Sequence, residues 1–221
     1  MVKHIGQDGD ISRELKRMFY RLKLSQPEIK DLKSLMITSS DEGEGKSIFS
    51  LAMALGISKE KEEPCLLVDA NWMRPVLHDF FGIERKFDLN QFWEDPIKCI
   101  QPSGIEHLDV LLAPTGVELD MSEEFVKSEV VRNVFDQLSK KYSSVIFDTS
   151  PILKNIDIYG SEPGTRNLDS LILSDFVEIS ILVILARKTH KQKVKKAKFA
   201  LQKDTNKVWA VLNNCNNPFY Q

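Results

Sequence analysis

The sequence has little of what marks secreted, metal-binding or membrane-spanning proteins. Its three cysteines are far apart and show neither a zinc-ligand spacing nor a disulfide framework, which favours a reducing cytosol. None of its four histidines pairs with another at metal-ligand spacing. The N-terminus has no apolar segment of the signal-peptide type, and the apolar run 179–186 is too short to span a bilayer. If the protein works at a membrane, something else must hold it there.

The sequence also lacks a strong excess of either charge. A net charge of −2 over 221 residues gives no overall field that would attract nucleic acid. One basic run, RKTHKQKVKKAK (187–198), could suggest nucleic acid or anionic lipid, but such a run is more often the solvated face of a helix. We therefore expect no nucleic-acid partner.

What the sequence does contain is a regular alternation of short apolar runs and amphipathic stretches, which predict buried strands and helices respectively. The expected strands are 34–39, 65–70, 108–113, 144–149, 180–186 and 208–213, and the expected helices are 11–24, 45–58, 122–141 and 190–203. This order indicates an α/β fold of three layers, a mostly parallel sheet with helices on both faces. We expect one domain over 1–221, with 1–30 as an N-terminal helical extension. The polar segment 155–170 predicts a long surface loop.

The connection between the first strand and the next helix carries a phosphate-binding motif. Residues 38–47 read TSSDEGEGKS, which ends like G-x-x-x-x-G-K-[ST] but lacks the first glycine. In such a loop Gly43 and Gly45 let backbone N–H groups face the phosphates at the positive end of the helix. Lys46 would reach the β- and γ-phosphates, and Ser47 would offer its hydroxyl to Mg²⁺. The alternative interpretation is a helix start with a solvated lysine.

Two aspartates end predicted strands. Asp69 lies in LLVDANWMRP and Asp148 in VIFDTSP, each directly after an apolar run. Ligands of parallel sheets bind beyond the carboxyl ends of the strands, so both carboxylates are expected near the phosphate loop. With the Ser47 hydroxyl they form a candidate magnesium site for phosphoryl transfer, because Mg²⁺ prefers oxygen ligands. Capping of a helix or turn by each aspartate is the alternative.

Several stretches in the same order match the motifs of one family. TSSDEGEGKS (38–47) is similar to TS-x-x-P-G-E-G-K-S, LLVDANWMRPVLH (66–78) to LLIDADLRRPxxH, and YSSVIFDTSPIL (142–153) to YDYVIIDTPPV. With 108–135 and the C-terminal strand-helix-strand pattern, nearly the whole chain resembles the bacterial tyrosine kinases of capsule and exopolysaccharide synthesis, within the MinD/ParA-like P-loop ATPases. The resemblance implies a P-loop NTPase fold, ATP or ADP with Mg²⁺ as ligands, and γ-phosphoryl transfer to tyrosine.

The resemblance implies a role for each matching residue. Lys46, Asp69 and Asp148 would serve catalysis, and Ser47, Asp69 and Asp148 would hold Mg²⁺ directly or through water. The residues that would hold the nucleotide are Gly43, Glu44, Gly45, Lys46, Ser47, Ile48, Arg74 and Asn213, with Arg74 by the phosphates and Asn213 at the adenine.

The family also implies partners. Its members dock on the cytoplasmic segment of a membrane polysaccharide co-polymerase, or chain-length regulator, which would place this protein in the cytoplasm, peripherally at the inner face of the membrane. A homo-oligomer is the other implied assembly. The family's assembly helix reads E-x-x-R-x-x-R, and here Glu14 and Arg17 fit while Tyr20 takes the third place.

Some positions depart from the family pattern. Asn71 replaces the second aspartate of the D-A-D motif, where it cannot act as a base and weakens Mg²⁺ binding. Ser150 replaces the second proline of D-T-P-P. In the phosphate loop Ser40 replaces the first glycine and Glu42 a proline, and Asp41 stands where the MinD/ParA branch has its signature lysine. We expect Asp41 and Glu42 to point to solvent and to lower ATP affinity modestly.

These departures keep two other hypotheses open. The chain could be a catalytically weak nucleotide-binding module that regulates a membrane co-polymerase, which Asn71 and the absence of a tyrosine-rich tail favour. It could also be a MinD/ParA-like ATPase, against which Asp41 counts.

Overall fold

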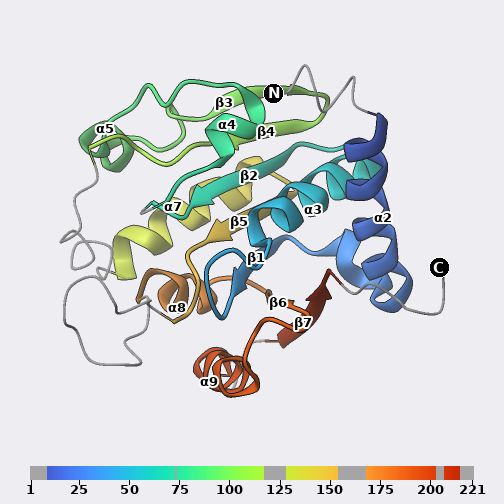
Figure 1. Ribbon diagram of the computed structural model, residues 1–221. Helices are drawn as coiled ribbons and strands as arrows, with labels where there is room; N and C mark the ends of the chain where they lie inside the picture. Colours follow the sequence, from blue (N-terminus) through green and yellow to red (C-terminus); the bar gives the residue numbers. More distant parts are fainter. Residues whose placement is uncertain (1–8, 73, 117–127, 154–167, 203–206, 215–221) are drawn as a thin grey trace.

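The computed structural model describes residues 9–72, 74–116, 128–153, 168–202 and 207–214. Within them a seven-stranded sheet runs in the order β3-β4-β2-β5-β1-β6-β7 (Figure 1). All neighbouring strands pair in parallel except β3 and β4, which pair antiparallel at one edge. The strands are β1 (Ser34–Ser39), β2 (Cys65–Ala70), β3 (Gln101–Ile105), β4 (Leu108–Leu111), β5 (Ser144–Thr149), β6 (Ile179–Leu185) and β7 (Lys207–Asn213). The expected α/β class with a mostly parallel sheet is confirmed.

Helices cover both faces of this sheet (Figure 1). Alternate strand residues face opposite ways, so Leu35 and Ile37 of β1 belong to one apolar cluster and Met36 to the other. The first cluster is completed by α2 (Gly9–Ser25), α3 (Lys46–Lys61) and α4 (Leu77–Phe81). The second is completed by α5 (Leu89–Glu94), α7 (Ser128–Lys141), α8 (Leu168–Ser174) and α9 (Lys191–Leu201). Burial on both faces explains why the central strands read as continuous apolar runs.

The sequence located most of these elements. The strands 34–39, 65–70 and 144–149 are correct to the residue, and the remaining predicted strands and helices are present with shifted ends. The elements for which no bounds were predicted are all short: the 3₁₀ helix Pro27–Asp31, β3, α4, α5 and α8. β3 contains Pro102 and Gly104 and shows little apolar alternation, and α4 and α5 are too brief for a clear helical period.

A predicted loop and a predicted helix lie partly outside the residues that the structure describes. The predicted loop 155–170 is wrong at its end, because residues 168–170 begin α8; residues 154–167 lie outside the described part, as do 122–127 of one predicted helix. The assignment of 1–221 to one domain stays a prediction.

The order of the strands in the sheet determines where the candidate site lies. β5 lies between β2 and β1, and because all three are parallel, their carboxyl ends open onto the same edge. Asp69 of β2 and Asp148 of β5 are register partners, and Ile37 of β1 is the partner of Asp148 on the other side. From β1 the chain crosses to β2, whereas from β5 it crosses back to β6 on the other side of β1. This reversal is where doubly wound sheets bind ligands.

No helix among the described residues is long and apolar enough to cross a membrane.

The N-terminal helix α2 is held against α3 by a close approach at a glycine. The Phe19 ring is buried against α3, and a Cβ added at Gly56 would lie 2.1 Å from its Cγ atom. Gly56 therefore makes room for the aromatic side chain that fixes α2 to the rest of the fold.

We expect Gly56→Ala to destabilise the protein because the whole Phe19 ring must move to admit one methyl group. The free energy of unfolding should fall by about 1–3 kcal/mol, measured by urea denaturation. In a Phe19→Leu background the same change should cost far less, because alanine is the better helix former by about 1 kcal/mol. An equal cost in both backgrounds would contradict this packing.

Candidate phosphate-binding and magnesium site

The loop 40–47 leads from β1 directly into α3, the order that a phosphate-binding loop requires. Gly43 and Gly45 have φ angles of 72° and 90°, in the left-handed region that favours glycine. Gly45 is the N-cap of α3, so the N–H groups of the first helical turn have no intrahelical partner there. Lys46, although charged, is only 8% exposed. The loop thus combines a helix N-terminus, a buried ammonium and left-handed glycines, which together favour anion binding.

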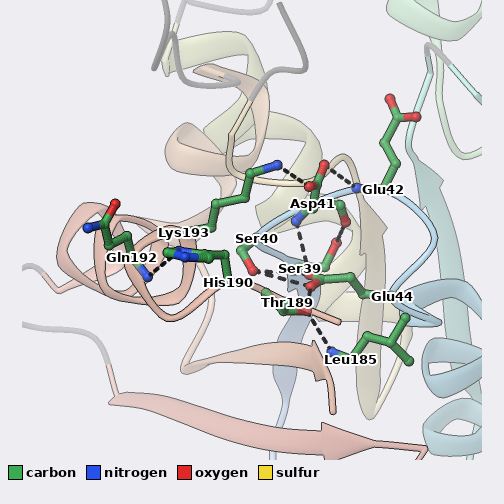
Figure 2. A network of polar contacts seen from close by, with 10 residues as sticks. All are labelled: Ser39, Ser40, Asp41, Glu42, Glu44, Leu185, Thr189, His190, Gln192 and Lys193. Atoms are coloured by element: carbon green, nitrogen blue, oxygen red, sulfur yellow. Dashed lines mark hydrogen bonds and ion pairs between the residues drawn. The ribbon is translucent and has the colours of Figure 1, made fainter. Parts of the chain in front are cut away.

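The buried side chain of Glu44 stabilises this loop through hydrogen bonds. Its carboxylate is buried and accepts hydrogen bonds from the backbone N–H of Asp41 at 2.9 Å and from the hydroxyl of Ser40 at 3.1 Å. The hydroxyl of Thr189, just before α9, also donates to it (Figure 2). The serine that replaces the usual first glycine therefore has a function, because it supplies one of the donors that a buried carboxylate requires.

Asp41 and Glu42 do not simply point to solvent as expected. Asp41 forms an ion pair with Lys193 of α9 and accepts a hydrogen bond from the backbone N–H of Glu42 (Figure 2). Glu42 forms an ion pair with Arg74, which lies between β2 and α4. Ion pairs thus connect the first part of the loop to two segments that are distant in the sequence. Each of the two carboxylates, Asp41 and Glu42, has a cation beside it.

Asp69 and Asp148 lie side by side at the ends of β2 and β5. Asp148 is fully buried; its Oδ1 atom accepts a hydrogen bond from the Ser50 hydroxyl at 3.0 Å, while Oδ2 is buried without a hydrogen-bond partner. Asp69 is 1% exposed and accepts hydrogen bonds from the backbone N–H groups of Asn71 and Leu77, each at 3.2 Å. Asp69 therefore also holds the start of α4, as the capping alternative proposed.

Burial changes the titration of both carboxyl groups. Burial, and after it the neighbouring charge of Asp148, raise the pKa of Asp69 to about 7 against the opposing backbone N–H groups. Burial also raises the pKa of Asp148 to about 6, opposed by the hydroxyl of Ser47, the ammonium of Lys46 and the hydroxyl of Ser50. Two adjacent buried carboxylates with an unpaired oxygen would be stabilised by a further cation.

The residues present fit Mg²⁺. The unpaired Oδ2 of Asp148, the neighbouring Asp69 and the Ser47 hydroxyl are all oxygen donors, as this ion requires. No group of three or more histidine, cysteine, aspartate or glutamate side chains that could hold a metal occurs within the described ranges. Mg²⁺ commonly takes one or two protein carboxylates and completes its shell with water and substrate phosphates.

Asn71 and Ser150, which both depart from the related motifs, contact each other. The Ser150 hydroxyl donates to the Asn71 side-chain oxygen at 3.0 Å, and the Asn71 amide donates to the carbonyl of Arg74 at 2.9 Å. Both side chains are buried. The amide thus ties the end of β5 to the segment after β2, a structural role that the sequence did not reveal.

The remaining predicted nucleotide residues are spread around the loop. Asn213, at the end of β7, donates its amide to the carbonyl of Glu44 at 2.9 Å, and a Cβ on Gly45 would lie 2.3 Å from that amide nitrogen. Ile48 is 46% exposed in the first turn of α3. The structure therefore gathers Lys46, Ser47, Asp69 and Asp148, whereas Arg74 and Asn213 make contacts to the loop itself.

Sequence reasoning missed several partners of the loop. Thr189 and Lys193 belong to a stretch that we interpreted as a solvated basic face. Ser50 was also missed, although its position one turn after Lys46, on the same side of the helix, was a usable signal.

The chain is similar to several named proteins and solved structures. No family model matches the chain. The tyrosine-protein kinase YwqD of Bacillus subtilis is 30% identical over 188 residues, which cover 84% of this chain and 73% of YwqD. CapB of Staphylococcus aureus, named as a candidate tyrosine-protein kinase, is 29% identical over 217 residues, covering 95% and 87% of the two chains. The solved kinase domain of VpsO is 23% identical with a TM-score of 0.72, covering 92% and 95%.

We expect Asp148→Asn to stabilise the protein at pH 8 when nucleotide and Mg²⁺ are absent. Because the folded-state pKa of Asp148 is raised, the folded protein binds more protons than the unfolded chain between about pH 4 and 6, so stability falls as pH rises through this window. Asparagine removes that penalty. Urea titrations should show a gain of about 1–3 kcal/mol at pH 8 and less than about 1 kcal/mol at pH 4.

The exposed Asp136 of α7 provides the control, because Asp136→Asn should change stability by less than about 0.5 kcal/mol at either pH. A loss of stability in Asp148→Asn at pH 8 would show that the carboxylate is already satisfied in the ligand-free protein.

Asn71→Asp, which restores the residue of the related motif, should destabilise this protein. The change removes the amide donor to the Arg74 carbonyl and places another buried carboxylate two residues from Asp69, which already accepts a hydrogen bond from the residue 71 backbone. We expect the free energy of unfolding to fall by about 2 kcal/mol or more at pH 8. Asn133→Asp, on the exposed side of α7, is the matched control. Equal stability of the two variants would rule out the structural role of the Asn71 amide.

Proposed function

The chain belongs to the bacterial tyrosine-protein kinases, and on that premise we propose that it binds ATP with Mg²⁺ at the 40–47 loop and transfers the γ-phosphoryl group to a tyrosine. The observation that carries this assignment is the buried, unpaired Oδ2 atom of Asp148 beside Lys46, Ser47 and Asp69. This arrangement provides oxygen ligands and an ammonium at the point where a polyphosphate would meet the helix N-terminus.

In the proposed reaction, the residues of the 40–47 loop and the two aspartates bind the substrate and stabilise its charge. Backbone N–H groups from Gly43 to Ile48 hold the phosphates, and the Lys46 ammonium lies on the β- and γ-phosphates. Ser47 and Asp148 would hold Mg²⁺, and Asp69 would do so directly or through water. The ion would supply charge neutralisation for the transferred phosphoryl group.

Asp69 also serves the proton transfer in the proposed reaction. Its carboxylate lies beside Asp148 at the end of β2, where it would orient the hydroxyl of the acceptor tyrosine and take its proton. The rest of the barrier reduction comes from positioning and charge stabilisation, because phosphoryl transfer requires little covalent participation by the protein.

Burial limits which tyrosine can accept the phosphoryl group. Tyr142 is 4% exposed, and its hydroxyl donates a hydrogen bond to Asp109 at 2.8 Å. Burial is the larger cause, and the contact with Asp109 the smaller, of the raised pKa of Tyr142. Tyr20 on α2 is 45% exposed. Tyr159 and Tyr220 lie outside the described residues. The acceptor is therefore Tyr20, one of these two tyrosines, or a tyrosine of another chain.

The same family assignment supports a place for the reaction. The kinase would act in capsular or exopolysaccharide synthesis, in the cytoplasm at the inner face of the membrane, and dock on the cytoplasmic segment of a polysaccharide co-polymerase. Homo-oligomerisation through α2 belongs to the same proposal, and Glu14 and Arg17 already form an ion pair on that helix.

A specific observation favours a second function. The Asn71 side chain is hydrogen-bonded to the Ser150 hydroxyl and the Arg74 carbonyl, and the Arg74 side chain is paired with Glu42. A nucleotide-binding module with weak catalysis, which signals its bound state to the membrane partner, would tolerate both features. A MinD/ParA-like ATPase is less well supported, because Asp41 replaces that branch's lysine and is paired with Lys193.

Incubation with Mg·ATP, with and without a peptide from the membrane partner, distinguishes these functions. Phosphotyrosine should form and should fall by about 100-fold or more in Lys46→Met, which removes the ammonium from the phosphates. Lys59→Met, at the exposed end of the same helix, is the matched control and should keep the activity. ADP without phosphotyrosine would indicate an ATPase, and binding without either product a regulatory module. Failure to bind Mg·ATP at millimolar concentration would exclude all three functions.

A further inference from the structure

Positive charge is concentrated on α9 and the turn before it. Residues 187–202 contain seven lysines and arginines and no aspartate or glutamate, although the chain as a whole has a net charge of −2. Figure 1 places α9 at the β7 end of the sheet, on the periphery of the molecule. The charge is therefore presented by one element at one end of the fold.

The exposed side of α9 is defined by the residues that face the core. Ala197, Ala200 and Leu201 are buried and mark the inner side of the helix. At 100° per residue, Phe199 projects from the opposite side, and it is 73% exposed. The residues around it on the outer side are exposed lysines, which with Phe199 we call the basic face: Lys191, Lys195, Lys196, Lys198 and Phe199.

Phe199 distinguishes this face from an ordinary solvated helix surface. Lysines alone would be explained by contact with water, as the sequence suggested. An aromatic ring that stands one turn from Lys195 and Lys196 and points directly away from the core gains nothing from water. Basic residues combined with an exposed aromatic side chain on one side of a helix are typical of segments that lie in the interface of an anionic bilayer.

We propose that the basic face of α9 docks on an anionic lipid surface. Phe199 enters the boundary between headgroups and acyl chains, and the lysines contact lipid phosphates while their aliphatic stems lie along the interface. Charge complementarity selects the partner, because the face carries no carboxylate and the cytoplasmic leaflet is negative. The docking needs neither nucleotide nor a protein partner, so it is independent of the kinase activity.

Lys193 does not contribute to this face. It lies toward the inner side of α9 and pairs with Asp41, while Thr189 contacts Glu44 (Figure 2). The N-terminal half of α9 is thus attached to the phosphate loop, whereas its outer side remains available to a surface. Docking through α9 would hold the phosphate loop at a fixed position relative to the membrane.

The test is sedimentation of the full chain with phosphatidylglycerol-containing vesicles and with pure phosphatidylcholine vesicles. The chain should bind only the anionic vesicles, and raised salt should weaken the binding. Lys195→Glu with Lys196→Glu should weaken it by at least about 25-fold, because each basic residue near the surface contributes about fivefold. Phe199→Ser should weaken it by about tenfold through the loss of apolar burial.

Matched control variants test whether the loss of vesicle binding is specific to the basic face or follows from any change of charge or hydrophobicity. Lys59→Glu with Lys140→Glu makes the same change of charge on exposed residues of α3 and α7, and Leu24→Ser removes an 85% exposed apolar side chain from α2. Both should bind vesicles like the parent chain.

Three results would overturn the proposal. They are equal binding to neutral vesicles, equal losses in the control and α9 variants, and no binding to anionic vesicles at low salt. In the last case binding to soluble polyglutamate would assign the face to an acidic protein instead. Thermal unfolding of each variant verifies that the exposed substitutions leave the fold intact.

Discussion

The burial of two neighbouring carboxylates is the constraint on which the candidate site depends. Asp69 and Asp148 end adjacent parallel strands at full burial, where an unpaired charge is costly. The surrounding groups reduce that cost only in part: Ser50 and backbone N–H groups donate to the carboxylates, and Lys46 lies near Asp148. The remaining unpaired oxygen is the feature on which the proposed magnesium and phosphate site at this edge of the sheet depends.

A second regularity is that unusual residues of the site occur in compensating pairs. Each substitution relative to the related motifs has a partner that satisfies it: Ser40 with Glu44, Asp41 with Lys193, Glu42 with Arg74, and Asn71 with Ser150. Local satisfaction of charge and hydrogen bonds explains how so acidic a loop can remain suited to an anion. It also means that restoring one member of a pair to the common residue breaks a contact rather than repairing a defect.

The sequence predicted what depends on local pattern. Continuous apolar runs located β1, β2 and β5 to the residue, and the motif around Lys46 located the loop 40–47 between a strand and a helix. It did not predict contacts between side chains far apart in the chain, since nothing in residues 187–198 indicates that Lys193 lies on Asp41. The direction of Arg74 was likewise invisible, because it depends on which carboxylate is nearest after folding.

The anchoring of the phosphate loop has a consequence for the order of events during synthesis. The loop lies early in the chain, yet its contacts come from Thr189, Lys193 and Asn213, which are 145 to 169 residues further on. Contacts of such long range form only after the intervening chain has been made and folded. A ribosome-bound chain that has β1 and α3 but lacks β7 therefore has the motif without its final geometry. On the proposed function, the geometry that binds nucleotide is therefore a property of the finished molecule.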